Sequence, residues 1–188
     1  MEIIKNELNE SYRLLKNFID NDSNINAIES AAELMKVSIK NGGKVISCGN
    51  GGSMCDAMHF TQEMNGYFLK KRNPFRGLCV SDPSYITCVA NDTKFDFIFS
   101  RFIESHGDQG DIAFGLSTSG NSQNIIEAFK KAKEIGMFVI SLTGNDGGEA
   151  AKYSDINLNV DFKGSSSFIQ EIHIKIIHSI IECIEASC

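Results

Sequence analysis

Strand-like apolar runs alternate with stretches of helical periodicity along most of this chain. Five short runs rich in Val, Ile, Leu, Phe and Cys are separated by segments whose apolar residues recur every three or four positions. Parallel strands need crossover connections, which are usually helices, so this alternation predicts an α/β fold with a doubly wound parallel sheet. We expect strands at 44–48, 77–81, 111–116, 137–142 and 155–160.

Helices are expected between these strands, and two more are expected before the first strand. The intervening patterns predict helices at 53–65, 95–106, 123–136 and 165–185, and a turn leading into irregular or helical chain at 84–90. Amphipathic patterns at 1–20 and 25–40 form an N-terminal helical pair, which is typical of packing against another subunit. We expect a single domain over 1–188, with this pair in 1–42 and the α/β core in 43–188.

Composition excludes several classes of function. The formal net charge of −6 argues against nucleic acid as a general partner. Neither a signal peptide nor a run long enough to span a bilayer is expected. The six cysteines show no paired CxxC spacing, and Cys48, Cys79 and Cys88 lie in strand-like surroundings, so we expect reduced thiols in a cytoplasmic protein.

A hydroxyl-rich turn stands where the third predicted strand passes into a helix. Ser117, Thr118, Ser119 and Ser122 surround Gly120 and Asn121 there. The unpaired amides and positive dipole of a helix start favour an anion, and hydroxyls add neutral donors. This pattern predicts a phosphate site, with a sugar phosphate as the natural ligand.

Two alternatives to a phosphate site built from this turn alone are a helix cap at Ser122 and a contribution from basic side chains elsewhere. Ser122 could simply cap the following helix, as serine often does. Phosphate binding to an acidic chain must come from local amides, or from the basic cluster Lys70, Lys71, Arg72 and Arg76, which is more often a solvated loop. The number of hydroxyls in so short a turn favours the phosphate site.

A second turn, Gly49-Asn50-Gly51-Gly52-Ser53, follows the first predicted strand. It lacks the G-x-G-x-x-G spacing of a dinucleotide-binding loop. Asn50 could donate to and accept from sugar hydroxyls, although a tight turn explains the pattern equally well. Both turns lie at carboxyl ends of strands, where ligands of parallel sheets bind.

Two helices carry further polar side chains. His59 and Glu63 share one face of the helix after the glycine turn, as a surface pair, a proton-transfer couple or metal ligands. The last helix contains Gln170, Glu171, His173 and His178 among isoleucines. Periodicity alone would pair His178 with Glu182 and Gln170 with His173, and it leaves open whether Gln170 and His178 could meet at one metal.

Together these segments resemble the phosphoheptose isomerase family of the sugar isomerase (SIS) domain superfamily over essentially the whole chain. The serine turn is shared across the superfamily, whereas His59 and Glu63 together with Gln170 and His178 are more specific. The resemblance is carried by Gly49-Asn50-Gly51-Gly52-Ser53, Cys55-Asp56-Ala57-Met58-His59-Phe60, Asn91-Asp92, the serine turn, Leu142-Thr143-Gly144, and Gln170-Glu171-Ile172-His173-Ile174-Lys175 with His178.

The resemblance implies a flavodoxin-like three-layer SIS fold and a homotetramer with active sites between subunits. It implies conversion of sedoheptulose 7-phosphate to D-glycero-D-manno-heptose 7-phosphate, the first step toward heptoses of bacterial lipopolysaccharide or capsule. The resemblance implies phosphate contacts from Ser117, Thr118, Ser119 and Ser122, and sugar contacts from Asn50, Gly51, Gly52, Asn91 and Asp92. It also implies one Zn²⁺ per subunit, with the ligands His59, Glu63, Gln170 and His178. Two of these ligands, Glu63 and Gln170, are implied to bind the substrate as well.

An aldose–ketose isomerase moves a proton between adjacent carbons through an enediol, which needs a base and an acid. Glu63 and His178 are the expected pair, with Glu63 as the base. A carboxylate committed to zinc is a poorer base, so either the metal polarises the carbonyl and the roles are shared, or it leaves or shifts during turnover.

The chain also departs from the family pattern. Tyr67 stands where members often have arginine, Ser167 where an aspartate is common, and Met54 where some members have histidine or alanine. These changes could alter the preferred heptose phosphate. Two other classes are a non-catalytic SIS adaptor and a sugar-phosphate-sensing regulatory module, but retention of Glu63 and His178 argues against the first and the absence of a DNA-binding segment against the second.

Overall fold

A five-stranded parallel sheet forms the centre of the molecule. The computed structural model describes residues 1–186, and the strands lie in the order β2-β1-β3-β4-β5. This is the flavodoxin-like order, which confirms the expected fold class. The strands are β1 Val45–Gly49, β2 Gly77–Cys79, β3 Ile112–Ser117, β4 Phe138–Gly144 and β5 Ile156–Val160.

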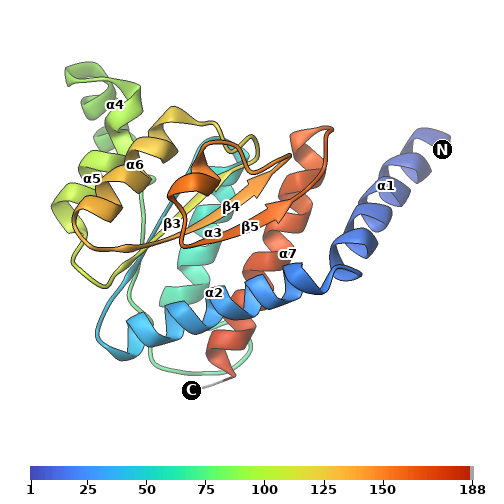
Figure 1. Cartoon of the computed structure of the whole chain (residues 1–188), viewed down its shortest axis with the longest axis horizontal. Coiled ribbons are helices and arrows are strands. Elements are labelled where there is room, and N and C mark those ends of the chain that lie inside the picture. Colours follow the sequence, from blue (N-terminus) through green and yellow to red (C-terminus); the bar gives the residue numbers. More distant parts are fainter. Residues whose placement is uncertain (187–188) are drawn as a thin grey trace.

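Helices cover both faces of the sheet (Figure 1). One apolar cluster joins the sheet to α2, α3 and α7, and a second joins the opposite face to α4, α5 and α6. Strands β1 and β3 are buried along their whole length, as expected for a sheet covered on both faces. The helices are α1 Glu2–Ile19, α2 Asp22–Lys40, α3 Gly52–Asn65, α4 Pro83–Asp92, α5 Ile98–His106, α6 Gln123–Glu134 and α7 Ser166–Glu185.

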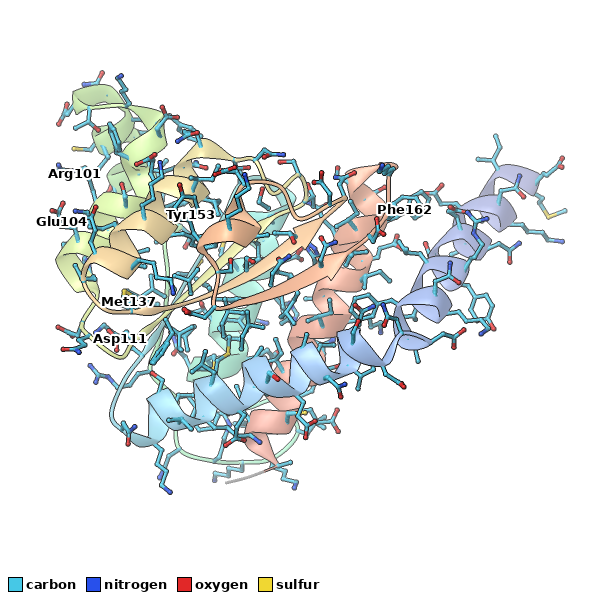
Figure 2. All side chains as sticks on the ribbon, viewed as in Figure 1. Arg101, Glu104, Asp111, Met137, Tyr153 and Phe162 are labelled. Atoms are coloured by element: carbon cyan, nitrogen blue, oxygen red, sulfur yellow. The ribbon has the colours of Figure 1, made fainter. Side chains whose placement is uncertain are left out.

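The two N-terminal helices differ in how they meet the core. Helix α2 begins at its cap Asn21 and buries Ile28, Ala31, Ala32 and Met35 against the sheet and α7. Helix α1 projects away from the body (Figure 1), and side chains stand clear of the protein along most of its length (Figure 2). Only its last turns contribute to the core, through Leu14 and Phe18.

The chain between β2 and β3 is more helical than its pattern indicated. Residues 84–90 are the middle of a ten-residue helix, α4, whose cap Asp82 accepts a hydrogen bond from the Tyr85 amide. Asp82 followed by Pro83 is a helix-start signal that could have predicted it. The helix expected at 95–106 begins instead with the 3₁₀ turn Phe95–Phe97, and another 3₁₀ turn, Ala150–Tyr153, was not predicted.

The structure shows where the three cysteines with predicted strand-like surroundings lie. Cys48 is buried on β1 and Cys79 is half-buried on β2, whereas Cys88 is exposed on α4, so the strand-like surroundings predicted for Cys88 are wrong. Cys188 lies outside the described residues.

Across residues 1–186, no helix combines the length and the apolar character needed to cross a membrane.

Candidate active site

Two polar turns lie side by side at the carboxyl edge of the sheet. One follows β1 and the other follows β3, and these two strands are neighbours. The chain turns in opposite directions from this pair, because β2 lies beyond β1 and β4 beyond β3. A topological switch point of this kind is where open α/β sheets bind ligands.

The hydroxyls of the serine turn converge. Ser117 Oγ lies 3.0 Å from Ser122 Oγ and 3.4 Å from Ser119 Oγ. Ser122 occupies the N-cap position of α6, as the capping alternative expected, but its side chain makes no capping hydrogen bond and its hydroxyl instead faces Ser117. Three hydroxyl groups therefore surround the start of α6, whose first amides have no intrahelical partner. An anion bound here would be surrounded by neutral donors.

The serine turn is held from behind by the chain after β4. Gly120 has a φ of +65°, and a Cβ there would lie 2.1 Å from the Gly147 carbonyl oxygen. The Gly120 carbonyl accepts a hydrogen bond of 2.8 Å from the Ala150 amide, and the Asn145 side chain donates to the Thr118 carbonyl. These contacts hold the serine turn against the loop that follows β4.

The Asn50 side chain bridges the two turns. Its amide exchanges a pair of 2.9 Å hydrogen bonds with the amide of Asn124 on α6. Each amide keeps one N–H and one lone pair for a ligand. Sequence reasoning predicted Asn50 but missed Asn124, since an asparagine in the first turn of a helix is read as a local polar residue.

His59 is at the centre of a second cluster, between α3 and α7. Its Nε2 atom lies 3.2 Å from Nε2 of His178 and 3.3 Å from Oε1 of Glu63. The Glu63 side chain is 16% exposed, so its carboxylate is largely sheltered from water. The structure thus brings His178 to the predicted His59/Glu63 pair, so the two residues belong to a cluster of three side chains rather than to an isolated pair.

The surroundings of this cluster favour a neutral His178. Burial lowers the pKa of His178, and the neighbouring His59 and Lys175 lower it further, against the opposing effect of Glu63. The Phe68 ring stacks on the His178 imidazole with centroids 5.3 Å apart. A neutral imidazole can accept a proton or bind a metal.

Asp56, which the sequence did not single out as a site residue, lies on the same helix as His59. One of its carboxylate oxygens is buried without a hydrogen-bond partner. Burial raises the pKa of Asp56 to about 6, and the nearby His59 opposes this rise. Its spacing of three residues before His59 was the available signal.

The other polar residues of α7 separate from one another. The Gln170 amide packs on Gly52, where a Cβ would lie 2.5 Å from Nε2 of Gln170. His173 is fully buried and donates from Nε2 to the Thr143 carbonyl at 2.9 Å. The pairing of Gln170 with His173 by periodicity is therefore wrong, because the two side chains leave α7 toward different neighbours. Glu171 is exposed and accepts a hydrogen bond from Ser11 on α1.

Asn91 and Asp92 lie at the exposed end of α4. Asn91 donates to Asp92 at 3.0 Å, and Cys88 donates to the same carboxylate. Within residues 1–186, no hydrogen bond joins either residue to the two turns or to the histidine cluster.

Among the described residues, no hydrogen bond or ion pair joins the basic cluster to the serine turn. Arg72 is bound to Glu185, and Arg76 donates to the Gly42 carbonyl. Lys70 and Lys71 are exposed. Anion binding at the serine turn must therefore come from hydroxyls and helix amides.

The residues that could hold a metal are Gln170 and the three members of the histidine cluster, His59, Glu63 and His178. In the part of the chain that the structure describes, no three His, Cys, Asp or Glu side chains form a complete ligand group. The chemistry of the donors nevertheless fits zinc, and two ligand atoms about 2.0–2.1 Å from a tetrahedral zinc lie about 3.3–3.4 Å apart. The separations of 3.2 and 3.3 Å around His59 Nε2 match that spacing.

Comparison with known proteins identifies the relatives of this chain. Residues 8–144 match the SIS domain family. The chain is 50% identical over 184 residues to the phosphoheptose isomerase of Vibrio cholerae, covering 98% of this chain and 96% of that protein. The chain belongs to the phosphoheptose isomerase family of SIS domain proteins.

Solved structures of this family share the whole architecture. The phosphoheptose isomerase of Neisseria gonorrhoeae superposes with a TM-score of 0.92 at 39% identity, covering 98% of both chains. The phosphoheptose isomerase of Francisella tularensis gives a TM-score of 0.93 at 33% identity, covering 98% of this chain and 97% of that one. The chain is accordingly a sugar-phosphate isomerase of the SIS fold.

The three departures from the family pattern can now be located. Tyr67 is exposed at the start of the segment that follows α3. Ser167 lies in the first turn of α7, where its amide and hydroxyl contact the capping Ser165. Met54 lies in the first turn of α3, beside the glycine turn. Two of the three therefore stand at the edge of the sheet that carries the serine turn.

Proposed function

We propose that the cluster of His59, Glu63 and His178 performs the isomerisation characteristic of the phosphoheptose isomerase family, between sedoheptulose 7-phosphate and D-glycero-D-manno-heptose 7-phosphate. The observation that supports this proposal is the position of His59 Nε2, which lies 3.2 Å from His178 Nε2 and 3.3 Å from Oε1 of the sheltered Glu63 carboxylate. Glu63 and His178 come from different helices, so only the fold joins them.

The substrate phosphate binds at the serine turn. The hydroxyls of Ser117, Ser119 and Ser122 and the hydroxyl of Thr118 donate to its oxygens, and the first amides of α6 stabilise its charge. The bridged Asn50 and Asn124 and the backbone at Gly51 and Gly52 contact the sugar hydroxyls. The Gln170 amide packs on Gly52 and binds the same sugar. In an oligomer, Asn91 and Asp92 reach the sugar of a neighbouring subunit.

Proton transfer follows from the chemistry of the two ionisable groups. Glu63 removes a proton from C1 of the ketose, which leaves an enediol, and returns that proton to C2. His178 moves a proton from the C1 hydroxyl to the oxygen at C2 by way of its neutral imidazole. The product is an aldehyde at C1 and a secondary alcohol at C2, so atoms and charge balance.

One Zn²⁺ per subunit is the proposed cofactor, with His59, Glu63, Gln170 and His178 as the residues that would hold it. The donor spacing around His59 Nε2 supports this set. When bound, zinc supplies a Lewis acid that polarises a carbonyl oxygen. Zinc binding measured by calorimetry after chelation, in wild type and in Gln170→Ala, tests the ligand set without any assay of activity; equal affinity in both would remove Gln170 from it.

A homotetramer in the cytoplasm completes the proposal. Exposed apolar side chains along α1, including Ile4 and Leu8, support burial of this helix against another subunit. The unpaired thiols of Cys48, Cys55, Cys79 and Cys88 support a reducing compartment.

The reaction is tested by incubating purified protein with sedoheptulose 7-phosphate and following the aldoheptose 7-phosphate by NMR. Glu63→Gln keeps the shape of the side chain but removes the base, so we expect kcat to fall by about 10²–10⁴-fold. Glu127→Gln, on α6, is the matched control and should keep wild-type turnover. Wild-type kcat in Glu63→Gln would remove the carboxylate from its role as base.

The same assay separates the rival functions. An adaptor or a sugar-phosphate sensor would bind the ketose phosphate without forming product, whatever metal is present. An isomerase consumes it until both heptose phosphates are at equilibrium.

A further inference from the structure

A buried ion pair lies behind the histidine cluster, outside the residues assigned to the reaction so far. The side chains of Arg72 and Glu185 are only 6% and 2% exposed, and Arg72 Nε donates to the Glu185 carboxylate at 3.0 Å. A buried charge is costly unless it is paired and fully hydrogen-bonded. The contacts of both partners show what this pair connects.

Glu185 binds the segment that follows α3. Its carboxylate accepts hydrogen bonds from the amides of Phe68, Leu69 and Lys70 at 2.6–2.9 Å. In Figure 1 this segment runs close to the carboxyl-terminal end of α7. Burial alone would raise the pKa of Glu185, but the three amides and the Arg72 charge hold it below its usual value, so the carboxylate is ionised.

Arg72 binds the carboxyl-terminal end of α3. Its guanidinium donates to the backbone carbonyls of Glu63, Met64 and Gly66, at distances of 2.6–3.1 Å. It also lies over the Phe75 ring, 3.8 Å from the centroid. The planar guanidinium of Arg72 thus donates hydrogen bonds to carbonyls at the end of α3 and also pairs with the Glu185 carboxylate on α7. The ammonium group of a lysine has no planar fork and cannot make the same set of hydrogen bonds.

These contacts bear directly on the catalytic cluster. Glu63, whose carbonyl Arg72 holds, supplies the carboxylate on α3. Phe68, whose amide Glu185 holds, stacks on His178. Glu185 itself lies two helical turns after His178 on the same side of α7. The ion pair therefore reaches both sides of the cluster.

We propose that Arg72 and Glu185 are positioning residues, which set the separation of α3 and α7 and hold Phe68 against His178. The proposal rests on the proposed catalytic role of Glu63 and His178. Neither residue touches the reacting atoms, so their effect is expected on turnover rather than on phosphate binding.

Arg72→Lys is the first test, because it keeps the charge and removes the planar fork. We expect kcat with sedoheptulose 7-phosphate to fall at least tenfold while KM changes less than threefold, since the serine turn lies at another edge of the molecule. Arg76→Lys is the matched control, since Arg76 lies in the same connection and donates to the Gly42 carbonyl rather than to α3 or Glu185, and it should keep wild-type constants. Unchanged kcat in Arg72→Lys, or a rise in KM alone, would overturn the proposal.

Phe68→Leu keeps the ion pair and an apolar side chain against the core but removes the ring from His178, so it tests the proposal even if Arg72→Lys does not fold. We expect the same loss of kcat in a variant that remains folded. Wild-type kcat in Phe68→Leu would overturn the link from the ion pair to His178.

Crystal structures of wild type and Arg72→Lys give a readout independent of activity. We expect the separation of His59 Nε2 and His178 Nε2, 3.2 Å here, to widen by more than 1 Å in the variant. An unchanged separation would overturn the proposal even if turnover fell. Wild-type protein that lacks isomerase activity would instead overturn the proposed function, while the structural comparison would still decide the positioning role.

Discussion

His173 shows how one buried side chain can link stability to pH. The imidazole is fully buried, donates to the Thr143 carbonyl, and leaves Nδ1 without a hydrogen-bond partner among the described residues. Burial lowers its pKa from 6.5 to about 4, although the bond to Thr143 opposes this shift. It is therefore neutral in the folded protein near neutral pH, and its role is to tie α7 to the end of β4.

This lowered pKa predicts a loss of stability in mild acid. Between pH 6.5 and about 4 the unfolded chain binds a proton at this residue and the folded chain does not. The free energy of unfolding therefore falls as the pH drops through this window, by up to about 3 kcal/mol. In His173→Gln, whose amide can still donate to Thr143, urea midpoints should depend less on pH between 7 and 4.5.

His106→Gln is the control for this measurement, because His106 is exposed on α5. It should retain the wild-type dependence of the urea midpoint on pH. If His173→Gln also retained it, the neutral buried state of His173 would be wrong.

At the scale of a single element, the serine turn depends on a glycine conformation. Gly120 combines a positive φ with close contact to the Gly147 carbonyl. A side chain there must both adopt a left-handed conformation and displace the loop after β4. Because that loop holds the turn from behind, the hydroxyls would lose their shared orientation.

Comparing Gly120→Ala with Gly110→Ala separates these two costs. Gly110 also has a positive φ, but a Cβ there would meet nothing within 4 Å. Gly110→Ala should therefore cost only the conformational strain, about 1–2 kcal/mol of unfolding free energy, with an unchanged KM. Gly120→Ala should cost more and should raise KM for the sugar phosphate. Equal effects of the two changes in denaturation and kinetics would contradict the packing argument.

On the scale of the whole molecule, α1 is the part whose sequence is least explained by the single chain. Its apolar residues are spaced for burial, yet Ile4, Leu8 and Tyr12 are each more than 60% exposed. The remaining helices bury their apolar faces in the two clusters on either side of the sheet. A second copy of the chain is the partner that would bury this stripe symmetrically.

Leu8→Ser is expected to weaken the proposed tetramer without affecting the fold of the subunit, because Leu8 is 65% exposed and belongs to neither apolar cluster of the described residues. Size-exclusion chromatography with light scattering should show dissociation at a higher protein concentration than wild type. Asn6→Ser, on the opposite side of the same helix, should behave as wild type. A monodisperse wild-type monomer would remove the oligomer from the proposal.

Local patterns were sufficient for the succession of strands and helices along the chain, for a parallel sheet covered on both faces and for the position of the serine turn, whereas the flavodoxin-like strand order was implied only by the family resemblance. Periodicity and turn residues act over a few positions, so 111–116 and 123–136 were assigned to within two residues. The convergence of Ser117 and Ser122 also follows from local geometry, because they flank one short turn at a helix start.

Only the tertiary structure decided which distant groups meet. His178 could have faced Glu182 on its own helix, but packing of α7 against α3 turns it to His59. The same packing directs Gln170 to Gly52 and His173 to Thr143. The basic cluster that contains Arg72 was interpreted as a phosphate-binding patch or, more commonly, a solvated loop, and the burial of Arg72 against Glu185 required a partner more than a hundred residues away. Side-chain direction on a helix is known from sequence only relative to that helix, whereas the neighbour it meets depends on how the helices pack on the sheet.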